Sequence, residues 1–180
     1  MHPRQGGGFD LAQAHLEWAG GAWGSLTASY LTPPGMSSAG FDRIDGGAAD
    51  DDLRGDSEDD LLEGNNGADK LYGGDGFDGL FGDDGDDYAE GGNEEDFIVG
   101  NAGNDTLYGD SRNGDVGAHD QIYGGDGDDK LYGQDGDDLI FGGVGKDAID
   151  GGDGDDLIQG RDDKDNIQGG AGDDEIEGED

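Results

Sequence analysis

The sequence of 180 residues contains no cysteine and only three histidines. Disulfide bonds and thiolate metal sites are therefore excluded. Positive charge is also scarce: 9 Lys and Arg stand against 47 Asp and Glu, so the formal net charge is −38. Such a chain repels nucleic acid and bare acidic membrane surfaces, and it attracts cations. The composition therefore predicts metal ions as partners and no nucleic acid.

Long apolar runs are absent as well. The start of the chain, MHPRQGGGFDLAQ, has no apolar run of signal-peptide length, and no stretch of about eighteen apolar residues is present to span a membrane. Only 30% of the residues are hydrophobic and 42 are Gly, which loses much backbone freedom on folding. We expect a soluble chain without a signal peptide or a membrane span. By itself, without a bound partner, such a chain should resemble a disordered polymer.

Motifs of hydrolytic enzymes are missing too. The sequence has no H-E-x-x-H, and Trp23-Gly24-Ser25-Leu26-Thr27 lacks the second Gly of a nucleophile elbow. The only imidazoles are His2, His15 and His119, and two of them lie near the start of the chain. A serine or metal hydrolase site is therefore not expected, and we predict that this chain is no enzyme.

A nine-residue unit repeats fourteen times over residues 46–177. Position 1 of the unit is Gly throughout, position 6 is Asp throughout, and position 8 is Leu or Ile except at Ala89. The position-6 residues are Asp51, Asp60, Asp69, Asp78, Asp87, Asp96, Asp105, Asp120, Asp129, Asp138, Asp147, Asp156, Asp165 and Asp174. A period this short predicts a solenoid, because one unit cannot bury its own apolar face and neighbours must stack.

Each position of the unit predicts a local structure. Gly at position 1, with Gly, Asn or Asp common at position 2, favours a turn over the first six residues with positive φ. The last three residues are enough for a short strand whose position-8 side chain points inward. The predicted core is one aliphatic ladder: Leu53, Leu62, Leu71, Leu80, Ala89, Ile98, Leu107, Ile122, Leu131, Ile140, Ile149, Ile158, Ile167 and Ile176.

So thin a core in so acidic a chain needs another source of stability. Stacked turns would place the position-6 carboxylates and backbone carbonyls around a hard cation. Calcium suits such oxygen ligands best, because magnesium demands a strict octahedron and zinc prefers His or Cys. An EF-hand is excluded: Asp126-Gly127-Asp128-Asp129-Lys130 has Lys at the fifth place of the loop. The sequence predicts several bound Ca2+ ions.

Units such as GGDGDDKLY at 124–132 and GGDGDDLIQ at 151–159 resemble RTX nonapeptide repeats, also called hemolysin-type calcium-binding repeats. The resemblance implies an all-β, right-handed parallel β-roll with two units per turn. It also implies that each Ca2+ sits between units two apart on the same edge, held by Asp side chains and turn carbonyls. The turn glycines that match the motif are Gly73, Gly76, Gly82, Gly85, Gly124, Gly127, Gly133, Gly136, Gly142, Gly145, Gly151 and Gly154.

The resemblance divides the aspartates between two edges. One edge would stack Asp51, Asp69, Asp87, Asp105, Asp129, Asp147 and Asp165, and the other Asp60, Asp78, Asp96, Asp120, Asp138, Asp156 and Asp174. Position 4 is Glu58, Glu94 and Asp163 where Gly is expected, and an insertion occupies residues 110–119. Weaker sites are expected next to these departures, and residues 124–159 are expected to bind best. About ten ions would offset roughly half of the negative charge.

The segments outside the repeats are assigned by composition. Residues 1–31 are predicted to form a lead and a β-hairpin cap, 32–45 a linker, and 178–180 a tail. The hairpin rests on alternation at 12–18 and 23–31; a three-residue loop, 20–22, would place Leu16 opposite Leu26. An alternative is that the hairpin is the edge of a larger upstream domain.

Function and location follow from the resemblance and leave alternatives open. It implies a calcium-binding module of a secreted bacterial protein that folds as it binds Ca2+. The chain could instead be the C-terminal part of a larger secreted enzyme or toxin, or a structural adhesin-type module. Aromatic residues at position 9 predict outward stripes that either stabilise neighbouring strands or contact an extracellular protein or carbohydrate. A monomer is expected.

Overall fold

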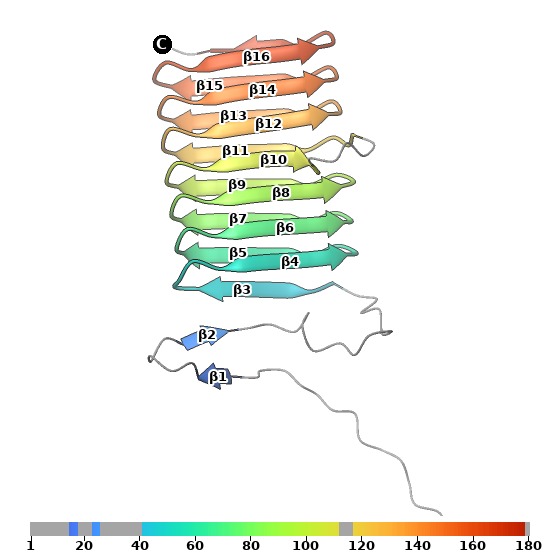
Figure 1. Ribbon diagram of the computed structural model, residues 1–180. Coiled ribbons are helices and arrows are strands. Elements are labelled where there is room, and N and C mark those ends of the chain that lie inside the picture. The colour runs from blue at the N-terminus through green and yellow to red at the C-terminus, as the bar shows by residue number, and fades with distance from the viewer. Residues whose placement is uncertain (1–14, 18–22, 26–40, 112–116, 179–180) are drawn as a thin grey trace, which may run out of the picture.

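The computed structural model describes residues 15–17, 23–25, 41–111 and 117–178, which form β-strands joined by turns (Figure 1). The strands are β1 (His15–Glu17), β2 (Trp23–Ser25), β3 (Arg43–Gly47), β4 (Asp52–Ser57), β5 (Leu61–Asn66), β6 (Lys70–Asp75), β7 (Gly79–Asp84), β8 (Tyr88–Asn93), β9 (Phe97–Ala102), β10 (Thr106–Asp110), β11 (Gln121–Asp126), β12 (Lys130–Asp135), β13 (Leu139–Val144), β14 (Ala148–Asp153), β15 (Leu157–Asp162), β16 (Asn166–Ala171) and β17 (Glu175–Glu177). None of these segments is a helix that could cross a membrane.

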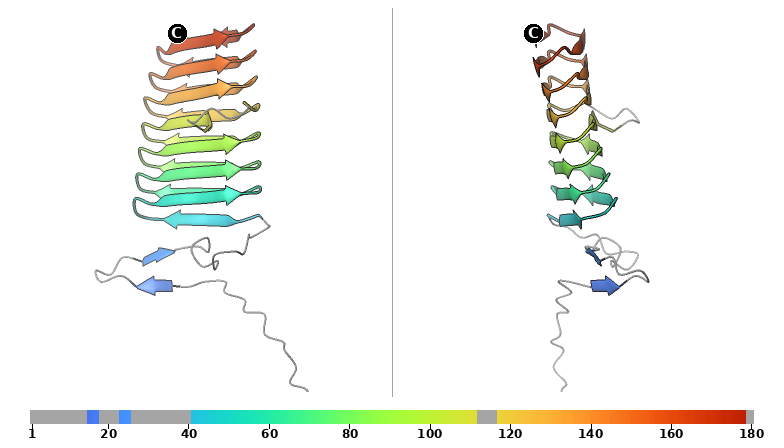
Figure 2. Two further views of the ribbon diagram at one scale, coloured as in Figure 1. Left: turned by 45° about the vertical axis from the view of Figure 1, so that its right-hand side comes forward. Right: turned by 90° about the vertical axis from the view of Figure 1, so that its left-hand side faces the viewer.

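From β3 onward, successive strands alternate between two sheets. One sheet has the order β16-β14-β12-β10-β8-β6-β4 and the other β17-β15-β13-β11-β9-β7-β5-β3, and every pairing in them is parallel. Figure 2 shows the result as a flat stack of coils, two layers thick. The predicted all-β parallel solenoid with two units per turn is confirmed.

The pairing register follows the nine-residue period. Leu71 pairs with Leu53 on one side and Ala89 on the other, so position 8 stacks on position 8 two units away. Apart from the five-residue β10, the interior strands are six residues long, positions 7 to 9 followed by positions 1 to 3. The predicted three-residue strand is therefore too short. Position 1 has no positive φ and continues the strand, which leaves only positions 4 to 6 to turn the chain.

The core is the predicted aliphatic ladder, with the exception of its last members. The side chains from Leu53 to Ile158 are all buried between the sheets. Ile167 is only partly buried, and Ile176 is 47% exposed. The prediction that Ile176 is a core residue is wrong, because no described turn covers it.

The stack begins before the first predicted unit. β3 starts at Arg43, within the predicted linker, and Ile44 is a buried core residue. The backbone N–H of Asp42 donates to Oδ1 of Asp60 at 2.7 Å, the same bond that joins later turns. Gly40, Asp42 and Ile44 stand at positions 4, 6 and 8 of one more, degenerate unit. Linker residues 41–45 therefore belong to the solenoid.

The N-terminal hairpin pairs in a different register from the predicted one. β1 and β2 are antiparallel, but Leu16 pairs with Gly24 and not with Leu26. A shift of two residues keeps every side chain on its face, so alternation alone could not distinguish the two registers. The predictions for residues 1–14, 18–22, 26–40, 112–116 and 179–180 lie outside the described residues.

Candidate metal sites

The position-6 aspartates line up along the two edges of the stack, where the chain turns from one sheet to the other. We call the set from Asp51 to Asp165 edge A and the set from Asp42 to Asp174 edge B. On each edge, the backbone N–H of one position-6 residue donates to Oδ1 of the next, over 2.7 to 3.2 Å. We call these two rows the inner ladders. They bring together the residues that the sequence assigned to each edge.

The second carboxylate oxygen of the inner ladders has no such partner. Oδ2 is buried and accepts no hydrogen bond at Asp51, Asp60, Asp69, Asp78, Asp87, Asp96, Asp105, Asp120, Asp129, Asp138, Asp147, Asp156 and Asp165. A buried carboxylate oxygen without a donor is costly. A row of such oxygens indicates a site for a ligand of opposite charge.

Position-1 glycines place this oxygen beside a backbone carbonyl. A Cβ on Gly133 would clash with Oδ2 of Asp138 and with the carbonyl oxygen of Gly151. The same overlap, with the equivalent Asp and Gly, occurs at Gly73, Gly82, Gly124, Gly142 and Gly151. Carboxylate and carbonyl oxygens of adjacent turns therefore converge where only Gly fits.

Position-4 glycines allow the turns to stack closely. At Gly76, Gly85, Gly127, Gly136, Gly145 and Gly154, φ is 122 to 149°. A Cβ there would clash with the backbone of the turn below. Glu58, Glu94 and Asp163 occupy this position with φ of 76 to 79°, a strained conformation for a residue with a side chain. The three departures noted in the sequence are thus strained turns.

Burial raises the pKa of the inner carboxyls above the ordinary value of 3.8. The pKa rises to about 7 for Asp78, about 9 for Asp96 and about 8 for Asp138, because each is removed from water and faces carboxylates of adjacent turns. Hydrogen bonds from the backbone oppose this rise. The folded chain therefore favours either a proton or a cation at these oxygens.

The donor set fits a hard cation that accepts many oxygens. Within the described residues, no three His, Asp or Glu side chains group closely enough to hold an ion by themselves. An ion would therefore need backbone carbonyls, such as that of Gly151, in addition to the Oδ2 atoms. Six to eight oxygens of this mixed kind suit Ca2+ better than Mg2+ or Zn2+.

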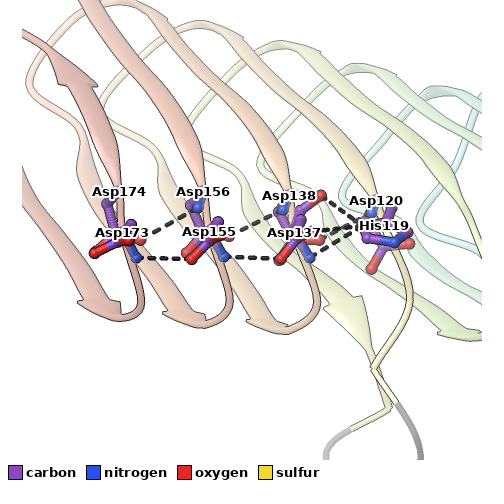
Figure 3. A network of polar contacts seen from close by, with 8 residues as sticks. All are labelled: His119, Asp120, Asp137, Asp138, Asp155, Asp156, Asp173 and Asp174. Atoms are coloured by element: carbon purple, nitrogen blue, oxygen red, sulfur yellow. Dashed lines mark hydrogen bonds and ion pairs between the residues drawn. The ribbon is translucent and has the colours of Figure 1, made fainter.

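An outer ladder at position 5 was not recognised in the sequence. Here the side chain accepts the N–H of the position-5 residue one turn later, over 2.7 to 3.1 Å, as Asp137 does from Asp155. Figure 3 shows both ladders side by side on edge B, with His119 taking the place of an Asp in the outer one. The frequent Asp at position 5 was the available signal.

The aromatic residues form two outward rows, one on each sheet. One row contains Tyr72, Tyr88, Tyr108 and Tyr132, and the other Phe81, Phe97, Tyr123 and Phe141, with neighbouring ring centroids 4.6 to 5.8 Å apart. Arg54 stacks on Tyr72 and Arg161 on Phe141. Because the rings contact one another, we interpret the rows as packing between strands.

Comparison with known families matched one model, described as RTX calcium-binding nonapeptide repeat (4 copies). It matches residues 36–62, 45–80, 81–113, 116–149 and 150–180. The first match includes Asp42 and Ile44, which agrees with the additional unit in the structure. Neither the curated proteins nor the solved structures gave a match.

Proposed function

Because the chain belongs to the family of RTX calcium-binding nonapeptide repeats, we propose that it is a module that folds by binding several Ca2+ ions along its two inner ladders. The observation that carries this proposal is the row of buried Oδ2 atoms without a hydrogen-bond donor. Each ion would be held by inner-ladder carboxylates together with carbonyl oxygens of adjacent turns. The bound ions would supply the positive charge that the chain lacks.

The residues of the chain explain why folding would depend on the ions. At a net charge of −38, compaction brings carboxylates together in a site without water, which opposes folding. A ligand that binds only the folded state stabilises it by mass action, and stacked sites make this effect cooperative. The module would therefore be unfolded at low calcium and folded where calcium is plentiful.

Folding that depends on calcium suits a protein that works outside a bacterial cell. Members of the family are typically parts of secreted proteins, so we propose a secreted module, either on its own or within a larger secreted enzyme, toxin or adhesin. A module of this kind would bind calcium at about 10⁻⁴ to 10⁻³ M, as extracellular calcium modules do. Much tighter binding would contradict this setting, because the chain would then fold before export.

The test is a titration of calcium into metal-free protein, followed by far-UV circular dichroism. We expect a cooperative change from coil to β-structure with calcium and little change with magnesium at the same concentration. A β-spectrum that is already complete in excess chelator would contradict the proposed switch. A spectrum that stays disordered at high calcium would contradict calcium-driven folding altogether.

A further inference from the structure

The turn between β10 and β11 differs from every other turn of edge B. It contains six extra residues, and the two stretches described, Asp110–Ser111 and Gly117–Asp120, flank the remainder. The inner ladder nevertheless continues across it: the N–H of Asp96 donates to Oδ1 of Asp120 at 2.8 Å. The hydrogen-bond ladder is therefore intact at the insertion, beside which the sequence predicts weaker sites.

The insertion changes the conformation of position 2. In the other units this position has positive φ, as at Asp56 and Gln134, and its side chain is exposed or partly buried. Asp110 has no positive φ, and it is only 2% exposed. Its Oδ2 accepts the N–H of Asp135 in the next turn at 3.0 Å. The carboxylate of Asp110 is thus turned into the stack.

This carboxylate interacts electrostatically with the inner-ladder carboxylates of Asp120 and Asp96. The preceding residue, Gly109, is the position-1 glycine whose Cβ would clash with Oδ2 of Asp120. Oδ2 of Asp120 and of Asp96 are both buried without a donor. Asp110 also raises the pKa of Asp120 and of Asp96, although burial contributes more in each case. Among the repeat units that the structure describes, no other adds a buried carboxylate from position 2.

We propose that Asp110 makes the insertion turn the highest-affinity calcium site of edge B, by adding a buried negative charge beside the carboxylates of Asp96 and Asp120. This inference rests on the proposed function. Calcium affinity in oxygen sites increases with the number of charged ligands and with their rigidity. The hydrogen bond to Asp135 holds the added carboxylate in place, whether it reaches the ion directly or through water.

A purely structural role is the competing explanation, because Asp110 also accepts the N–H of Asp135. Two substitutions separate these roles. Asp110→Asn keeps a side-chain oxygen for Asp135 and removes the charge, whereas Asp110→Ala removes both. Asp56→Asn is the matched control: it makes the same change at position 2 of edge B, where the side chain is exposed. All variants are compared at saturating calcium by circular dichroism to verify that they fold.

The experiment is competition between each protein and a chromophoric calcium chelator of similarly low affinity, which reports on the highest-affinity sites of the protein. We expect Asp110→Asn and Asp110→Ala each to weaken the highest-affinity site by about tenfold or more, and Asp56→Asn to leave it unchanged. Wild-type affinity in Asp110→Asn, with loss only in Asp110→Ala, would overturn the proposal in favour of the structural role. A wild-type chain that binds no calcium would instead refute the proposed function.

Discussion

The inner and outer ladders use the same kind of hydrogen bond, from a backbone N–H to a side chain that is usually Asp, yet they lie in different surroundings. Asp137 and Asp138 are neighbours in one turn, and each accepts a backbone N–H from an adjacent turn: Asp138 from Asp120 at 2.9 Å and Asp137 from Asp155 at 2.8 Å. Asp138 is 2% exposed, whereas the side chain of Asp137 is 55% exposed. The hydrogen bond is common to both ladders, so burial of the second carboxylate oxygen is what distinguishes the proposed calcium sites from the outer ladder.

The largest expected difference between the ladders is the effect of pH on the stability of the fold in the absence of calcium. The pKa of the inner carboxyls is raised from 3.8 to about 7 at Asp78, about 8 at Asp138 and about 6 at Asp147, mainly by burial. Because the folded chain binds these protons more tightly than the unfolded chain does, protonation stabilises the fold. This contribution is complete below about pH 4 and is lost as pH rises through about 6 to 8.

We therefore expect acid to replace calcium in part. Metal-free protein should show more β-structure by circular dichroism at pH 4.5 than at pH 8, and the difference should vanish in saturating calcium. Equal β-content at both pH values in metal-free protein would contradict the raised pKa values of the inner ladder.

The next effect separates the two ladders by substitution. Asp138→Ala removes a buried carboxylate that accepts the N–H of Asp120, and it should destabilise the calcium-loaded fold by about 3 kcal/mol or more. Asp137→Ala leaves the N–H of Asp155 to water and should cost about 0.5 kcal/mol. Urea unfolding in saturating calcium measures both. Equal losses would mean that burial does not distinguish the ladders.

A smaller effect is expected from glycines that shape the inner ladder. Gly133→Ala would force its Cβ against Oδ2 of Asp138 and the carbonyl of Gly151, so the fold should lose about 2 to 3 kcal/mol of stability and the ion at that turn. Gly47→Ala is the control, because its Cβ meets no atom and only the φ of 108° is strained; its cost should be about 1 to 2 kcal/mol. Bound calcium counted by equilibrium dialysis distinguishes the two variants. An unchanged count in Gly133→Ala would contradict the convergence of oxygens at position 1.

The smallest loss of stability is expected from substitutions in the aromatic rows on the outer faces of the sheets. The rings of Tyr108 and Tyr132 are stacked, with centroids 4.6 Å apart, so Tyr132→Ala should cost about 1 kcal/mol in calcium-loaded protein. Tyr132→Phe keeps the ring and should cost little. Thermal unfolding measures both, and the number of bound ions should not change. A loss of ions in Tyr132→Ala would show that the faces and the inner ladders are coupled.

The period and the resemblance to RTX repeats together predict much of this molecule. The period places position 8 in the core, because a strict repeat gives every unit equivalent neighbours. The resemblance implies two units per turn and therefore divides position 6 between two edges. The register between strands two apart, such as Leu53 with Leu71, follows directly. Where a repeat is intact, sequence spacing determines contact in space.

The failures lie where the repeat is degenerate or where the signal depends on three-dimensional packing. Asp42 was missed because its unit lacks Gly at position 1, although Asp and Ile keep their places. Residues with positive φ stand at positions 2 and 4 of the unit and not at position 1. Gly is needed at position 1 for another reason, because a carboxylate approaches its backbone closely. The burial of Asp110 depends on how the insertion is accommodated, which spacing does not encode.

The central claim is that the buried Oδ2 atoms of the inner ladders bind calcium. A crystal structure of the protein grown in calcium, with anomalous diffraction data collected at long wavelength, tests it most directly. We predict anomalous peaks along both edges, each within coordination distance of an inner-ladder Oδ2 such as that of Asp129 or Asp138. An ordered solenoid whose inner ladders contact only water would contradict it.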